Sequence, residues 1–133
     1  MNMNKVNVCI DFNNTLLDMV IDIAVVSPDS IIGSNSSFIK CELKKPANLE
    51  MFIIIFINKV LPYQNEIKNK NEDFFLKKSY NGDTDNDNSI IDKIFEFKNI
   101  WKKLGNHNKE IIFQYMILLC GIANTYYEKF SGN

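Results

Sequence analysis

The chain has 133 residues, of which 46% are hydrophobic and 23% are charged, a composition typical of one globular domain with a single core. Its net charge is −1 and all 15 basic residues are lysines, which disfavours arginine-dependent reading of DNA and arginine-dependent phosphoryl transfer. The longest apolar run, Met51–Ile57, is far shorter than the ~20 residues of a membrane span, and the N-terminal residues do not have the pattern of a signal peptide. We therefore expect a soluble protein, or one embedded in an assembly of other proteins.

Three cysteines, Cys9, Cys41 and Cys120, are widely spaced, and the single histidine, His107, lies in a polar segment. This spacing matches no zinc site, and an odd number of cysteines does not predict a disulfide framework. We expect reduced thiols in an intracellular protein that uses no metal and no cofactor.

The N-terminal third begins with an ambiguous segment, because Val6–Ile10 fits either a short strand or the start of a helix. The following residues predict a helix that is capped by Asp11–Asn14 and ends before Pro28. The β-branched residues within Val20–Val26 leave an extended strand open as an alternative. The polar segment after this helix predicts a flexible loop over about residues 29–37.

The middle of the chain predicts further short helices. Phe38–Leu43 fits a short helix or an extended segment, and a longer helix is expected from Pro46 to about Leu61. Tyr63–Asn69 adds another turn or two. Residues 79–88, which contain glycine and three aspartates, predict a second flexible loop.

Ser89–Phe130 predicts a helical hairpin around which the chain is organised. In the first arm, apolar residues recur every three or four positions from Ile90 to Leu104, the spacing of one helix face. Gly105 ends this arm, and the second arm is apolar on more than one face. The short connection favours antiparallel packing of the two arms. We therefore predict an all-α fold, a single domain of about five helices that ends in this hairpin.

One N-terminal stretch has the pattern of a catalytic motif. Val8–Leu16 resembles the first motif of haloacid-dehalogenase-type phosphatases, in which a strand leads into Asp-x-Asp-x-Thr-Leu. The resemblance would make Asp11 the nucleophile of a magnesium-dependent phosphatase. However, Asn13 stands where that family has its acid/base aspartate, and an amide cannot exchange a proton near neutral pH. Helix capping by Asp11–Asn14 is the favoured interpretation.

Other groups give weaker signals. Asp83, Asp85 and Asp87 match the first three ligand positions of an EF-hand loop, but the later positions do not match. His107 and Cys120 would lie about 20 Å apart along one helix, too far for a nucleophile–base pair. Four lysines near the hairpin turn predict a solvated helix end rather than a nucleic-acid site: Lys98, Lys102, Lys103 and Lys109. We predict no catalytic and no metal-binding residue.

Large aromatic side chains are the remaining candidates. Core packing is expected to account for most of them, while those near the C-terminal end extend past the core and offer a surface to a partner. The predicted partner-binding residues are Tyr126, Tyr127, Phe130, Trp101, Phe74 and Phe75.

Four segments carry a resemblance to a group of small proteins of giant DNA viruses, from the mimivirus-like and algal-virus lineages. They are Leu61–Tyr63, Ile67–Leu76, Ile100–Leu104 and Asn108–Tyr115. The likeness covers roughly Asn13 to Tyr127 and departs at Phe113, where a tryptophan is more usual. The resemblance implies a viral origin and an all-α fold, and it names no catalytic residue.

The leading hypothesis is a non-enzymatic viral interaction module, a minor structural component of the virion or a protein of the host cytoplasm. Its expected partners are viral proteins, either copies of itself or others, with no membrane span and no nucleic acid. Two alternatives remain: a degenerate phosphatase that uses Asp11, and a host-directed or nucleic-acid accessory factor that acts through its lysines.

Overall fold

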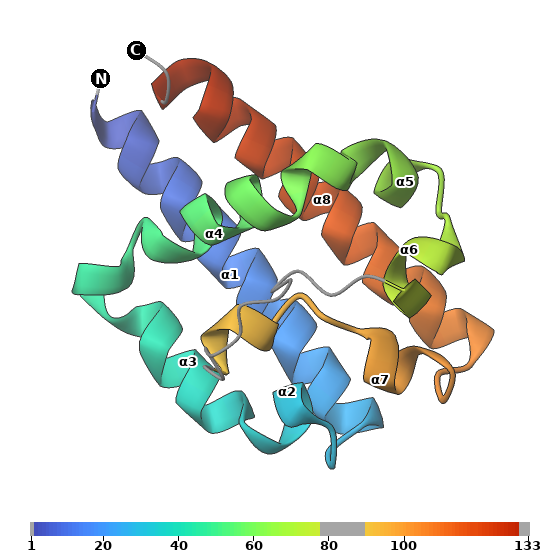
Figure 1. The fold of residues 1–133 in the computed structure, drawn as a ribbon. Coiled ribbons are helices and arrows are strands. Elements are labelled where there is room, and N and C mark those ends of the chain that lie inside the picture. Colours follow the sequence, from blue (N-terminus) through green and yellow to red (C-terminus); the bar gives the residue numbers. More distant parts are fainter. Residues whose placement is uncertain (1, 78–89, 131–133) are drawn as a thin grey trace.

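The computed structural model describes residues 2–77 and 90–130, and every regular element in these two stretches is helical (Figure 1). The all-α prediction is therefore confirmed. The elements are α1 (Asn2–Val26), α2 (Ile31–Ser34), α3 (Ser36–Lys44), η1 (Pro46–Asn48), α4 (Met51–Lys59), η2 (Leu61–Tyr63), α5 (Gln64–Lys68), α6 (Glu72–Lys77), η3 (Ile91–Lys93), α7 (Lys98–Trp101) and α8 (Asn106–Phe130). They are more numerous than the five helices predicted, and most of those between α1 and α8 are shorter.

The two long helices, α1 and α8, lie antiparallel and side by side, so that the start of α1 is near the end of α8 (Figure 1). Near the chain ends, Lys5 Nζ of α1 lies 5.9 Å from the ring centroid of Tyr126 of α8. At the other end of the pair, the Tyr115 hydroxyl donates a hydrogen bond to Asp22. Helix α4 contacts both long helices, and the shorter helices close the rest of the core.

Helix α1 forms as one 25-residue element because its buried residues recur at helical spacing: Cys9, Phe12, Leu16, Met19 and Ile23. The ambiguous segment Val6–Ile10 belongs to this helix, as do the β-branched residues up to Val26. The predicted cap at Asp11–Asn14 is wrong, since the helix begins at Asn2 and no free amide groups remain at those positions. Asn13 instead lies in the core, where its Nδ2 donates to the Leu49 carbonyl oxygen at 3.1 Å.

The predicted loop over residues 29–37 is also wrong, because most of it is helical. The Ser30 hydroxyl accepts a hydrogen bond from the Gly33 amide at 3.0 Å and caps α2. Ile32 of α2 and Ile39 of α3 are buried against the core. The burial of Ile32 and Ile39 and the Ser30 cap therefore stabilise α2 and α3 in an otherwise polar segment.

The second arm of the predicted hairpin is confirmed as α8, but the first arm is not one helix. The chain instead forms η3, a turn and the short α7. Phe95 packs on Phe56 of α4 at a centroid distance of 5.2 Å, while Phe97 packs on Phe75 of α6 at 5.3 Å. Phe95 and Phe97 thus pack on two different elements, and the backbone between η3 and α7 is a turn rather than a continuous helix.

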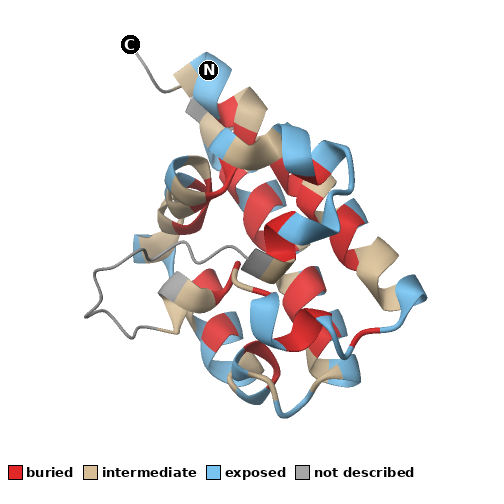
Figure 2. Ribbon diagram, turned by 45° about the vertical axis from the view of Figure 1, so that its right-hand side comes forward, coloured by how far each residue is buried: buried red, intermediate tan, exposed pale blue. Residues whose placement is uncertain are grey.

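Between these parts, Pro46 and Pro62 each fall in a 3-10 turn, so the helix predicted from Pro46 to Leu61 is shortened to α4. The additional turns predicted after it form η2 and α5. Buried residues line the inward sides of α4, η2 and α5 (Figure 2). The loop predicted over residues 79–88 lies outside the described residues.

Candidate functional site

Four of the six predicted partner-binding residues are buried, so they cannot contact a partner in this structure. Trp101, Phe74, Phe75 and Tyr126 are at most 7% exposed. For these four residues the structure supports core packing, the alternative that the sequence also offered. Tyr127 is 54% exposed and Phe130 is partly buried, which leaves a much smaller terminal surface than the one predicted.

Three of these buried aromatics, Phe74, Phe75 and Trp101, form a cluster with Phe113 that joins α6, α7 and α8. The ring centroid of Phe75 lies 4.6 Å from that of Trp101 and 5.2 Å from that of Phe113. The indole Nε1 of Trp101 donates to Glu72 at 3.0 Å, and Glu72 also pairs with Lys109 at 2.9 Å. These contacts lower the pKa of Glu72, mainly through the hydrogen bond from Lys109. The cluster therefore serves the packing of the core.

The phosphatase-like motif does not have the geometry that its chemistry needs. Asp11 lies in the middle of α1 with its side chain exposed, and the motif in those phosphatases follows a strand. Asp83, Asp85 and Asp87, the candidates for a cation loop, lie outside the described residues. Within residues 2–77 and 90–130, no three His, Cys, Asp or Glu side chains are grouped so that they could hold a metal ion.

His107 and Cys120 both lie on α8, His107 exposed and Cys120 buried. Burial raises the pKa of the Cys120 thiol from 9.0 to about 11, which is the opposite of what a nucleophilic cysteine requires. Of the four lysines near the α7–α8 turn, Lys109 pairs with Glu72, whereas Lys98, Lys102 and Lys103 are exposed.

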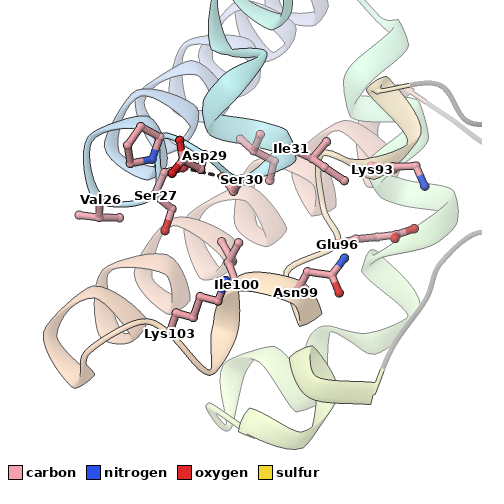
Figure 3. Close-up of a pocket in the computed structure, with 12 residues that line it drawn as sticks. Val26, Ser27, Asp29, Ser30, Ile31, Lys93, Glu96, Asn99, Ile100 and Lys103 are labelled. Atoms are coloured by element: carbon pink, nitrogen blue, oxygen red, sulfur yellow. Dashed lines mark hydrogen bonds between the residues drawn. The ribbon is translucent and has the colours of Figure 1, made fainter.

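A cavity of about 490 Å³ lies between the turn after α1 and the η3–α7 stretch (Figure 3). Asp29 and Glu96 line it together with Lys93 and Lys103. The buried Glu96 Oε2 atom accepts no hydrogen bond from the residues that the structure describes. Its volume is in the range of small-molecule sites. Its wall carries charges of both signs.

A second surface feature runs along α8 where it borders α1. Ile111, Tyr115, Leu118 and Ile122 share one side of the helix and are all at least partly exposed, Leu118 to 51%; we call these four residues the α8 ridge. Their spacing of four, three and four residues is that of a coiled-coil seam. Hollows of about 190 Å³ and 270 Å³ lie on either side of Tyr115. The ridge is thus a grooved apolar surface on the outside of the molecule.

The edge of the ridge that faces α1 is acidic. Asp11, Asp18 and Asp22 are exposed and, with spacings of seven and four residues, follow one side of α1; we call them the acidic row. The Asp22 carboxylate accepts the hydrogen bond of Tyr115 at 2.5 Å. Burial and then this hydrogen bond raise the pKa of Tyr115 from 10.0 to about 12, with a further contribution from Asp18.

Comparison with protein-family models, curated proteins and solved structures finds no match to this chain. Within the described part of the chain, no helix combines the length and the apolar composition of a membrane-spanning segment. The assignment of a site therefore depends on the geometry alone.

The α8 ridge was missed as a specific surface, although the sequence contained a signal for it. The sequence shows that this helix is apolar on more than one face, but it does not show which of these faces is exposed. The separation into a buried stripe around Met116 and an exposed one around Leu118 depends on which side of α8 faces α1. Sequence spacing alone does not give that orientation.

Proposed function

We propose that this chain is a non-enzymatic interaction module that binds a partner protein through the α8 ridge. The observation that carries the proposal is Leu118, a large apolar side chain 51% exposed in the middle of a coiled-coil-like stripe. Partly exposed apolar side chains flank it on the same helix face, Ile111, Tyr115 and Ile122, and hollows lie beside Tyr115. Exposed apolar side chains are common singly on protein surfaces, whereas a grouped apolar surface with adjacent hollows is typical of an interaction site.

The resemblance to proteins of giant DNA viruses supports placing this interaction among viral proteins. On that basis we propose that the chain is a minor component of a virion or of its assembly in the host cytoplasm. The presence of the chain in purified particles, at a fixed ratio to one neighbouring protein, is the expected result. Its absence from particles and from assembly intermediates would contradict this part of the proposal.

The binding surface itself is tested by site-specific photo-crosslinking in the cell that makes the protein. A photoreactive residue is placed at Leu118 and, as a matched control, at Ile54 of α4, which is 41% exposed. We expect a discrete crosslinked adduct from position 118 and none from position 54. A third probe at Tyr127 tests the terminal aromatic surface that the sequence predicted.

A second experiment places the photoreactive residue at Ile122, both in the otherwise unmodified chain and in the Leu118→Ser variant, and compares the yields of the crosslinked adduct. Because this substitution removes the central apolar contact, the yield at Ile122 is expected to fall several-fold. Equal yields from positions 118 and 54, or adducts from position 127 alone, would show that the α8 ridge is not the binding surface.

A further inference from the structure

We propose that the occupant of the α8 ridge is a cationic amphipathic helix, with an apolar face on the ridge and lysine or arginine side chains over the acidic row. This inference rests on the proposed function and adds the chemistry of the partner. Shape, charge and the sequence around the ridge each support it.

The shape of the surface fits a helix. Ile111, Tyr115, Leu118 and Ile122 follow the alternating spacing that lets two helices interlock side chains along a seam. From Ile111 to Ile122 the ridge is about 16 Å long, or three turns. The hollows beside Tyr115 offer places for the apolar side chains of a partner helix.

The charge of the surface selects a cation. Asp11, Asp18 and Asp22 are exposed, and none of them takes part in an ion pair with a lysine of the described residues. The single lysine of α1, Lys5, is paired with Glu50 at 2.8 Å. A partner helix with basic residues beside its apolar face would meet three carboxylates along the same edge.

A second copy of this chain is a poorer occupant. The exposed residues Gln114 and Gly121 beside the ridge carry no positive charge. On the ridge's own face of α8, a lysine follows only two turns beyond Ile122, at Lys129, so that one cation would face the three carboxylates of the other copy. Two copies packed through this face would leave the acidic rows largely unpaired or place them opposite each other, and like charges in an interface cost binding energy.

The test uses the whole chain and a designed leucine–lysine amphipathic peptide of about four helical turns. A matched peptide with glutamate in place of every lysine is the control. Binding is followed by the amide NMR signals of α1 and α8, and dissociation constants are measured by fluorescence anisotropy. We expect the lysine peptide to bind, to shift signals around Leu118, and to bind more weakly at ~0.3 M salt.

Two triple variants isolate the acidic row. In the first, Asp11, Asp18 and Asp22 are all replaced by asparagine; in the second, Asp29→Asn, Asp73→Asn and Glu128→Gln remove three exposed carboxylates elsewhere. The net charge changes equally in both. We expect the first variant to bind the lysine peptide about tenfold more weakly and the second to bind within about twofold of the unmodified chain.

Several results would overturn the inference: no binding of the lysine peptide, equal binding of both peptides, or equal weakening by the two triple variants. A dimer in sedimentation that Leu118→Ser dissociates would show that a second copy occupies the ridge. If crosslinking from Leu118 succeeds while the lysine peptide fails, the interaction surface stands and only its cationic partner is excluded. Failure of the crosslinking would instead refute the proposed function.

Discussion

The Tyr115 hydroxyl of α8 and the Asp22 carboxylate of α1 are joined by a hydrogen bond of 2.5 Å at the edge of the α8 ridge. Because burial and this bond favour the protonated phenol, the pKa of Tyr115 rises from 10.0 to about 12. A group whose pKa is raised on folding stabilises the fold fully below its unfolded pKa and loses that contribution as pH rises through the folded pKa. The Tyr115 contribution is therefore present below pH 10 and lost toward pH 12.

Tyr115→Phe is expected to lower the free energy of unfolding by roughly 1 kcal/mol at neutral pH, the usual contribution of one hydrogen bond. The difference between the unmodified chain and the variant should stay constant up to about pH 10 and shrink toward pH 12. Urea denaturation at a series of alkaline pH values measures it. A difference that does not change between pH 9 and pH 12 would show that the Tyr115 contribution does not depend on its raised pKa.

The contrast between α8 and the segment before it shows what helical spacing predicts. Both segments have apolar residues at intervals of three and four, and only α8 forms a long helix. In the earlier segment, Phe95 and Phe97 contact α4 and α6, respectively. These tertiary contacts override the helical spacing of the segment. The sequence does not show them, because they depend on where α4 and α6 lie.

Asn13 provides a test of the phosphatase hypothesis. Its Nδ2 donates to the Leu49 carbonyl oxygen, and its Oδ1 is buried without a donor. Asn13→Asp would complete the Asp-x-Asp motif, yet it would also place a buried carboxylate against a carbonyl oxygen. We expect a loss of at least about 2 kcal/mol in the free energy of unfolding and no gain of magnesium-dependent phosphatase activity.

The neighbouring substitution Asn14→Asp is the matched control, because Asn14 is exposed on the same helix. Its effect on stability is expected to stay within about 0.5 kcal/mol. Thermal and urea denaturation compare the two variants, and hydrolysis of an aryl phosphate with magnesium reports the activity. An Asn13→Asp protein that keeps its stability and hydrolyses the ester would revive the phosphatase hypothesis.

Gly33 sets the close approach of α2 to the end of α1. A Cβ atom at this position would lie 2.1 Å from the Ser27 carbonyl oxygen, a backbone atom that cannot rotate away. Gly33→Ala is therefore expected to destabilise the chain by about 1–3 kcal/mol.

Gly121 of α8 is the matched control for Gly33, because a Cβ there meets nothing within 4 Å. Gly121→Ala should stabilise the chain by about 0.5–1 kcal/mol, since alanine is the better helix former. Urea denaturation compares both variants with the unmodified chain. Equal effects of the two substitutions would contradict the close contact between α2 and the end of α1.

The candidate site was less predictable than the fold. The sequence indicates an excess of apolar residues on α8 and makes the aromatics candidates for partner binding, but Trp101 and Phe75 are buried in the core. The exposed stripe around Leu118 depends on the angle at which α8 rests on α1. The large aromatic side chains are core residues, whereas the exposure of Leu118 depends on how α8 is oriented against α1.

The three cysteines offer a direct check of how the long helices are packed. Cys9 of α1 and Cys120 of α8 are buried, while Cys41 of α3 is exposed. Burial raises the pKa of the Cys9 thiol and raises that of Cys120 to about 11, so few thiolates form at these positions at neutral pH. A maleimide reagent at pH 7 is expected to modify one thiol rapidly and the other two only after unfolding, as measured by intact-protein mass spectrometry. Cys41→Ser should abolish the rapid step, and rapid modification of Cys9 or Cys120 in that variant would mean that α1 and α8 separate in solution.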